Sequence, residues 1–207
     1  VLHTSSSSNS DSDADDSSSL TVSAIRTGSS EGSGTSGSIG SALTGTYGQL
    51  TIAANGSYSY VANQAAADAL DAGDIVTDSF NYTVSDGTAT DTAVITITVI
   101  GINDTPTAQN DVGVIVEDGT LTVANSANAT LTGTYDATGE NSGDLIDTSS
   151  SSHTDSDSDT SASLSITQIK KSGGSNSAVG IGSSYNSSGT QVTGTYGTLT
   201  IGADGSY

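Results

Sequence analysis

The stretch Thr77-Asp-Ser-Phe-Asn-Tyr-Thr-Val-Ser-Asp-Gly-Thr-Ala-Thr-Asp-Thr-Ala-Val-Ile-Thr-Ile-Thr-Val-Ile100 decides the fold of this chain. Phe80, Tyr82 and Val84 occupy alternate positions, so they share one face of a strand. Asp86-Gly87 then interrupts the pattern with residues typical of a tight turn, and an alternation of Thr with Val and Ile follows. We therefore predict a β-hairpin with strands at residues 77–84 and 88–100, whose aromatic face contributes to a core.

The same alternation predicts further strands at residues 20–25, 48–53 and 57–61. Asn55-Gly56 and Asp204-Gly205 each lie between alternating runs, where they predict tight turns in which both central residues take a positive φ. Only residues 65–70 have helical character, and the glycine that follows limits that helix to two turns. Many short strands and one short helix predict an all-β fold of antiparallel β-sandwich modules.

An internal repeat indicates that these modules occur in tandem. Thr44-Gly-Thr-Tyr-Gly-Gln-Leu-Thr-Ile-Ala-Ala-Asn-Gly-Ser-Tyr58 returns as Thr193-Gly-Thr-Tyr-Gly-Thr-Leu-Thr-Ile-Gly-Ala-Asp-Gly-Ser-Tyr207, an offset of 149 residues from position 44 to position 193. The Ser- and Asp-rich tract that begins at Thr4 returns at Thr148, an offset of 144 residues. A match of this length indicates one whole repeat period followed by part of another.

The boundary between the modules is expected near the single proline, Pro106, which follows the longest alternating strand. We predict a first module at residues 1–102, a junction or linker at 103–111 and a second module at 112–207. The first module is expected to lack its opening strands, and the second its later ones. Flanking sequence or neighbouring chains would then supply the missing strands, whereas a stable monomeric fragment would contradict this expectation.

The charge balance excludes some partners and favours others. Asp and Glu number 23 against three Lys and Arg, for a net charge of −20, so divalent cations are expected to neutralise the acids. Direct binding of nucleic acid is excluded, because it needs clustered basic side chains. The chain has no cysteine for disulfides or thiolate sites, and it has no apolar run near the roughly 20 residues of a membrane helix.

Two aspartate runs have a spacing that suits calcium, which takes roughly six to eight oxygen ligands. Carboxylates at alternate positions of a loop can converge on one ion. The candidates are Asp11, Asp13 and Asp15 and, in the second repeat, Asp155, Asp157 and Asp159. Both runs lack the glycine and glutamate of EF-hand loops. The same tracts are also typical of solvated loops that keep a protein soluble, and the sequence leaves both interpretations open.

Three segments carry motifs in a specific order: Gly45-Thr-Tyr-Gly-Gln-Leu-Thr-Ile-Ala-Ala-Asn-Gly-Ser-Tyr-Ser-Tyr60, Ala67-Asp-Ala-Leu-Asp-Ala-Gly-Asp-Ile-Val-Thr-Asp-Ser-Phe-Asn-Tyr-Thr-Val-Ser-Asp-Gly87 and Thr96-Ile-Thr-Val-Ile-Gly-Ile-Asn-Asp-Thr-Pro106. Together they resemble the VCBS-type and bacterial cadherin-like tandem repeats of giant secreted adhesins, many of which carry RTX-type secretion signals. The resemblance implies an immunoglobulin- or cadherin-like sandwich, calcium at module junctions and a place at the bacterial cell surface. The Ser- and Asp-rich insertions at 4–19 and 148–163 are longer than the family's usual turn.

The resemblance also implies a calcium site at the module junction. Asn103 and Asp104 resemble the Asn-Asp element of cadherin linkers. The other candidate ligands are Asp86 at a hairpin tip and Asp111, Glu117 and Asp118 after the linker. An ion held there would remove hinge freedom and stiffen the array. The alternative interpretation is that Asn-Asp-Thr-Pro is an ordinary linker turn, because these residue types favour turns.

These features predict a structural repeat segment of a large secreted surface protein, forming a calcium-stiffened stalk, filament or matrix for adhesion or biofilm. Its expected partners are neighbouring repeat modules of the same or adjacent chains. The alternative is an adhesin module that binds surface glycans or a partner protein through the loops at 25–43 and 169–192. We expect no catalytic activity, because His3 and His153 occupy non-equivalent repeat positions and no nucleophile motif precedes a helix.

Overall fold

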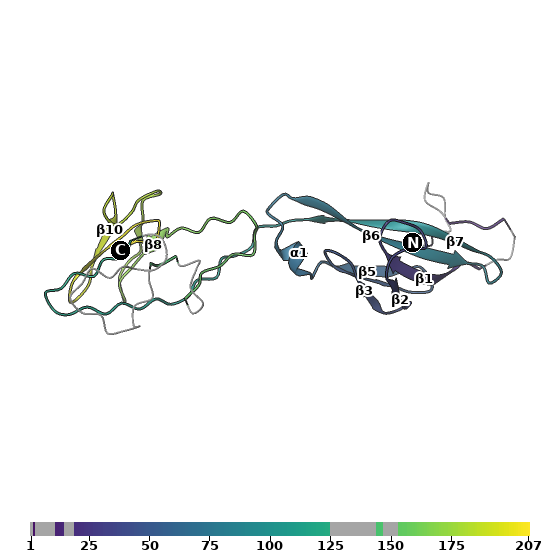
Figure 1. The fold of residues 1–207 in the computed structure, drawn as a ribbon, viewed down its shortest axis with the longest axis horizontal. Coiled ribbons are helices and arrows are strands. Elements are labelled where there is room, and N and C mark those ends of the chain that lie inside the picture. The colour runs from purple at the N-terminus through teal and green to yellow at the C-terminus, as the bar shows by residue number, and fades with distance from the viewer. Residues whose placement is uncertain (1, 3–10, 15–18, 125–143, 147–152) are drawn as a thin grey trace. The chain divides into compact units, whose positions relative to one another are not determined.

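The computed structural model describes residues 2, 11–14, 19–124, 144–146 and 153–207 (Figure 1). They form two compact units, Val1–Asp104 and Thr105–Tyr207, referred to below as the first and second unit. Their strands pair antiparallel, which confirms the predicted all-β class. The division falls within the predicted junction at 103–111, and the role of that segment as a linker stays a prediction.

Two sheets make up the first unit. One has the order β2-β1-β6-β7, and the other has the order β3-β4-β5. The strands of the first sheet are β2 (Ser36–Gly37), β1 (Thr21–Thr27), β6 (Ile75–Ser85) and β7 (Thr90–Ile100). The strands of the second sheet are β3 (Ala42–Thr44), β4 (Gln49–Ile52) and β5 (Tyr58–Val61). A short helix, α1 (Ala65–Asp68), follows β5, as the alanines predict.

The core of the first unit lies between these sheets. Phe80, Tyr82 and Val84 of β6 are buried on one face, which confirms the predicted aromatic face. Leu50 and Ile52 of β4 meet them from the other sheet and are fully buried. Because apolar residues of the two sheets pack against each other in one hydrophobic cluster, the unit is a β-sandwich.

The turns between strands differ in detail from the prediction. Among the described non-glycine residues only Asp118 and Ser188 have a positive φ, so Asn55 does not. Gly56 alone takes the left-handed conformation, with φ 81°. The amide N–H of Gly56 donates to the carbonyl of Ala53, and the Ala53 N–H donates to the Ser57 carbonyl. The loop is thus a turn closed by a glycine bulge, a geometry that needs a positive φ at one position only.

The second unit repeats part of this plan. Its strands pair as β8 (Gln168–Ile169) with β9 (Ser177–Ala178) and β10 (Thr190–Thr193) with β11 (Thr198–Ile201). β11 corresponds to β4 at the offset of 149 residues seen in the sequence. Gly205 has a φ of 84° and its amide N–H donates to the carbonyl of Gly202, so the bulged turn recurs. Val179, Ile201 and Ala203 form the core.

A buried carboxylate joins the two sheets of the first unit. Asp78 of β6 is 4% exposed, and it accepts hydrogen bonds from the backbone N–H groups of Thr46 and Tyr47, at 3.2 and 3.0 Å. The hydroxyl of Tyr60 donates to the same carboxylate at 2.9 Å. A Cβ atom at Gly45 would lie 2.4 Å from Oδ2 of Asp78, so the glycine permits this close approach. In the first unit the motif Gly45-Thr-Tyr-Gly48 is therefore an anchoring turn.

Because of this environment, we expect the first unit to lose stability in alkali. Burial, the hydrogen bond to Asp78 and its charge, in that order, raise the pKa of Tyr60 well above its usual value. The folded state thus holds the phenol proton more tightly than the unfolded state does, so this stability is full below pH about 10 and falls as pH rises further. Tyr60→Phe should flatten the decline in urea midpoint between about pH 9 and 11. An unchanged decline would contradict this assignment.

Candidate cation sites

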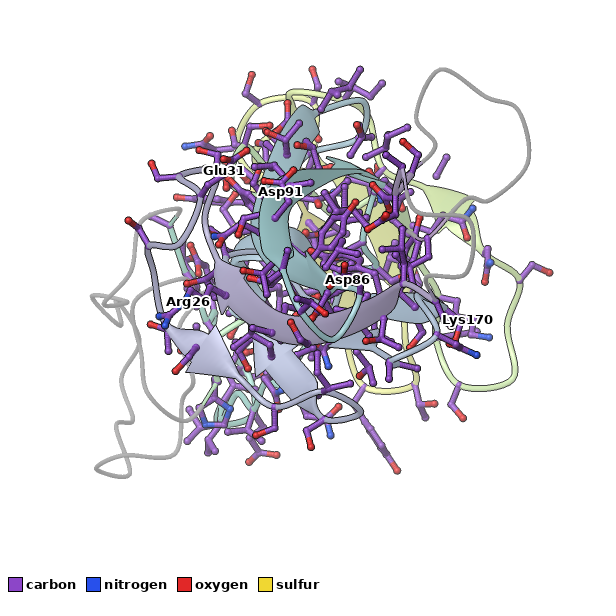
Figure 2. The ribbon with its side chains drawn as sticks, turned by 90° about the vertical axis from the view of Figure 1, so that its right-hand side faces the viewer. Arg26, Glu31, Asp86, Asp91 and Lys170 are labelled. Carbon is purple, nitrogen blue, oxygen red and sulfur yellow. The ribbon has the colours of Figure 1, made fainter. Side chains whose placement is uncertain are left out.

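Carboxylates gather around a hollow of about 350 Å³ beside the tip of the β6–β7 hairpin. They come from two parts of the chain that are far apart in the sequence: Asp11 and Asp13 from the N-terminal tract, and Asp86 and Asp91 from the hairpin. Figure 2 labels the two hairpin residues. None of the three basic side chains of the protein, Arg26, Lys170 and Lys171, lines the hollow. We call it the first acidic hollow.

The hairpin loop fixes the carboxylate of Asp86. Its Oδ1 atom accepts hydrogen bonds from the backbone N–H groups of Ala89 and Thr88, at 2.6 and 2.7 Å. These two bonds hold the pKa of Asp86 below its usual range, and a hydrogen bond from the carboxyl group of Asp13 acts in the same direction. Asp86 is therefore charged at neutral pH, and its carboxylate lies in hydrogen-bond contact with the carboxyl group of Asp13, with no basic side chain lining the hollow.

Asp11 lines the first acidic hollow and is partly buried. Its carboxylate accepts a hydrogen bond from Tyr82, whose phenol pKa is raised by burial, by the charge of Asp11 and by that bond. The Oδ2 atom of Asp11 is buried, and within the described part of the chain it accepts no hydrogen bond. A buried carboxylate oxygen without a donor is costly unless a cation or a proton meets it.

A second acidic hollow, of about 670 Å³, lies in the second unit. Asp155, Asp157, Asp159 and Asp204 line it. Asp155 is 7% exposed and accepts a hydrogen bond from the backbone N–H of Gln109 at 2.7 Å. Asp157 accepts one from the backbone N–H of Asp159 at 2.9 Å. The predicted aspartate run of the second repeat thus lines one hollow from end to end.

The junction candidates do not gather with the hairpin. β6 and β7 pair from Ser85 and Thr90 at one end to Ile75 and Ile100 at the other. Asp86 therefore lies about 35 Å along the strands from Gly101. It cannot share a site within the first unit with Asn103 and Asp104, so its assignment to a junction site there is wrong. The predicted hairpin, with its turn at Asp86-Gly87, already places this tip at the end of the strands away from Gly101.

The remaining candidates lie apart from the two hollows. The amide of Asn103 donates to the backbone carbonyl of Asp104. Glu117 and Asp118 line a different hollow, with the basic Lys170 and Lys171. Asp111 lies near the phenol of Tyr207, whose pKa is raised by burial and then by the charges of Asp111 and Asp144. Asp15 falls outside the described residues.

The sequence alone did not identify two of the aspartates that line the hollows, Asp91 and Asp204. Asp91 faces Val84 across the hairpin, so a correct register would have placed it near Asp86. Asp204 occupies the repeat position of Asn55, so the offset of 149 residues could have pointed to it. Within the described residues no three acidic, histidine or cysteine side chains stand in a ready arrangement to hold a metal ion. The carboxylates line hollows rather than a closed cage.

The comparison with protein families bears on the first unit. Residues 1–101 match the family model for the bacterial cadherin-like domain. The cadherin-like part of the predicted resemblance is thereby supported for this segment, and the VCBS and RTX context stays a prediction. No curated protein and no solved structure matches the chain. Among the described residues, no helix is long and apolar enough to cross a membrane.

Proposed function

We propose that this chain is a structural repeat segment of a large extracellular bacterial surface protein, and that calcium stiffens it into part of an adhesive stalk, filament or matrix. The observation that carries the proposal is the first acidic hollow, where the N-terminal tract and a hairpin tip bring four carboxylates together without a basic side chain. The cadherin-like match and the internal repeat support the adhesive role.

The residues of the first acidic hollow suit a hard divalent cation. All the charged groups that line it are oxygen donors, which calcium prefers and softer metals do not. Asp11 contributes a buried oxygen without a hydrogen-bond donor, and the carboxyl group of Asp13 makes a hydrogen bond with Asp86. The residues that would hold calcium are therefore Asp11, Asp13, Asp86 and Asp91. When bound, the ion would supply positive charge that no side chain of the hollow supplies.

Calcium at this place would act mechanically. Asp11 and Asp13 belong to the tract that precedes β1, whereas Asp86 and Asp91 belong to the last hairpin of the unit. An ion shared between them would tie the start of the unit to the hairpin tip and restrict the motion of both. The second acidic hollow would act in the same way through Asp155, Asp157, Asp159 and Asp204. Repeated along an array, such ties would give a stiff fibre.

We expect calcium to raise the unfolding free energy of the chain by about 2.7 kcal/mol per site when free calcium is roughly one hundred times Kd. Asp86→Asn keeps the hydrogen-bond acceptor for the loop but removes a charged ligand, so it should weaken calcium affinity about tenfold or more. Asp68→Asn is the matched control, since this exposed aspartate of α1 lies outside the hollow. Calorimetric titration and thermal melting in calcium, magnesium or chelator would measure both effects.

Each outcome of that titration has a definite meaning. A calcium-dependent melting shift that Asp86→Asn reduces and Asp68→Asn retains would support a site in the first acidic hollow. Equal binding by both variants would remove the hollow from the proposal, and an absence of any calcium effect would leave an acidic spacer without metal stiffening.

The second candidate function is a glycan- or partner-binding module. The observation that favours it is the hollow of about 860 Å³ in the second unit, where Tyr196 is fully exposed beside Leu199 and Ile115. An exposed ring next to apolar side chains is a surface on which a sugar ring can stack. Saturation-transfer NMR with soluble glycans would test it, with Tyr196→Ala as the variant that should abolish transfer.

A further inference from the structure

The chain that connects the two units is held firmly where it leaves the first unit. Gly101 directly follows β7, and its backbone is hydrogen-bonded through both of its polar groups. Its N–H donates to the carbonyl of Asp74 at 2.9 Å, and its carbonyl accepts the N–H of Gly73 at 3.1 Å. The turn before β6 therefore fixes the chain of the first unit up to Gly101.

The second unit takes hold of the chain directly after Pro106. The N–H of Thr107 donates to the carbonyl of Ser156 at 2.7 Å, and the N–H of Ser156 donates back to the carbonyl of Thr107 at 3.0 Å. This exchange of two hydrogen bonds is an antiparallel β-bridge. Ser156 belongs to the Ser- and Asp-rich insertion at 148–163, so this insertion binds the connecting chain.

Two further contacts extend this hold along the connecting chain. The N–H of Gln109 donates to Oδ1 of Asp155 at 2.7 Å, and the Nδ1–H of His153 donates to the backbone carbonyl of Asn110 at 2.7 Å. Asp155 is buried, so water competes little for its bond to Gln109. Both contacts continue the antiparallel order of the bridge. The segment after the proline thus lies along the insertion.

We propose that residues 153–156 are a strap that fixes the connecting chain to the second unit and confines the hinge between the units to residues 102–106. The strap consists of hydrogen bonds within the second unit, so it acts without a bound ion. Pro106 stiffens the end of the hinge, because its ring fixes its own φ and restricts the residue before it to extended backbone. The strap gives the long insertion a structural role.

The strap sets the freedom of the hinge through the number of residues that can move. The hinge has five residues, 102 to 106, and it would have nine, 102 to 110, if the strap opened. The end-to-end distance of a flexible segment grows with the square root of its length, so the spread of distances between the units should widen about 1.3-fold. The inference goes beyond the calcium proposal and is independent of cation binding in either hollow.

Paired spin labels give a direct test, because the chain has no cysteine of its own. Ser59→Cys and Ser172→Cys place one label on each unit, both at exposed positions. Pulsed electron paramagnetic resonance in chelator then measures the distribution of the distance between the labels. Asp155→Ala together with Ser156→Pro removes the acceptor of Gln109 and one N–H of the bridge. This double variant should broaden the distribution about 1.3-fold.

A matched control makes the same two changes two residues later. Asp157→Ala together with Ser158→Pro alters the insertion where Asp157 bonds to Asp159, within the insertion itself, and it should leave the width unchanged. The N–H of Ile166, which bonds to Ala203 in the second unit, reports through its hydrogen exchange that the unit stays folded. An unchanged width in the strap variant with Ile166 still protected, or equal broadening by the control, would overturn the proposal.

Hydrogen exchange on the unmodified chain decides the question even if the strap variant unfolds. In chelator, the amides of Thr107 and Gln109 should exchange about tenfold or more slowly than the amide of Asn103 in the hinge, after correction for intrinsic rates. Exchange of Thr107 and Gln109 as fast as that of Asn103 would mean that the strap is open in solution and would refute its role. Since all these measurements are made in chelator, their failure is distinguishable from a failure of the calcium proposal.

Discussion

Replacement of Asp78 by alanine is expected to destabilise the first unit by about 3–5 kcal/mol, because it removes the acceptor of a buried hydrogen-bond cluster. The N–H groups of Thr46 and Tyr47 and the hydroxyl of Tyr60 would lose their shared partner. These groups come from the opposite sheet and its turn, so the damage would reach both layers of the sandwich. Urea unfolding, followed through the amide signals of β6, would measure the loss.

Two further variants serve as controls for Asp78→Ala. Asp78→Asn keeps one oxygen acceptor but loses charge, so it should fall between alanine and the natural protein. Asp68→Ala removes an aspartate of similar chemistry from the exposed surface of α1, where we expect a change within about 0.5 kcal/mol. If Asp78→Ala costs no more than Asp68→Ala, the carboxylate is not the joint between the sheets.

Replacement of Asn81 by alanine is expected to destabilise the first unit by about 3 kcal/mol. Asn81 is 2% exposed, its Oδ1 accepts the N–H of Gly32, and its Nδ2 donates to the carbonyls of Thr27, Gly28 and Ser33. One side chain thus holds the loop after β1 against β6. The loss is measurable by urea unfolding, and the amide of Gly32 should exchange faster in the variant.

Asn63 offers a matched comparison for Asn81. It is also an asparagine with a side-chain hydrogen bond, to Gln49 at 3.3 Å, but it is exposed. Asn63→Ala should therefore cost less than about 0.5 kcal/mol. Similar losses for the two variants, or an unchanged Gly32 exchange rate in Asn81→Ala, would show that the loop is held by other contacts.

The hydrogen bonds of Asn81 bear on the alternative function of glycan or partner binding. The loop that Asn81 holds belongs to the segment 25–43, which the sequence nominated as a variable contact loop. Its backbone is fastened at three carbonyls and one N–H by a buried side chain. A loop fixed in this way can present a preformed surface, but it has little freedom to adapt to a partner. The hollow near Tyr196 is therefore the better place to look for glycan binding.

Alternation predicted the strands well where one face meets a core. It placed Phe80, Tyr82 and Val84 inward, and the structure buries all three. Asp78 has the same phase, so the pattern alone implies a carboxylate directed inward, but not which donors it meets. Asn81 has the opposite phase, and it is buried because a distant loop folds over that face. The alternation of residues along a strand does not reveal whether a loop from elsewhere in the chain will cover one of its faces.

For the acidic sites, too, the sequence predicted the candidate residues but not which of them lie together. It indicated the aspartates at alternate positions as candidate calcium ligands, with solvated loops as the alternative, and it grouped Asp86 with the junction. The β6–β7 hairpin places Asp86 at the end away from Gly101, and the fold of the N-terminal tract brings Asp11 and Asp13 to it. The second hollow gained Asp204 for an equivalent reason, because a turn distant in sequence lies against the aspartate run.

By itself, the sequence determined the all-β class, the repeat with its offset of 149 residues, and the excess of acidic over basic side chains. These properties follow from the alternation of apolar residues, from the match between the two repeat copies and from the sum of the charges. Each of these can be read locally or added up along the chain. Only the tertiary structure decided which carboxylates share a hollow and which polar groups are buried. Those depend on pairing register and on contacts between segments dozens of residues apart, and backbone hydrogen bonding alone permits several registers until packing selects one.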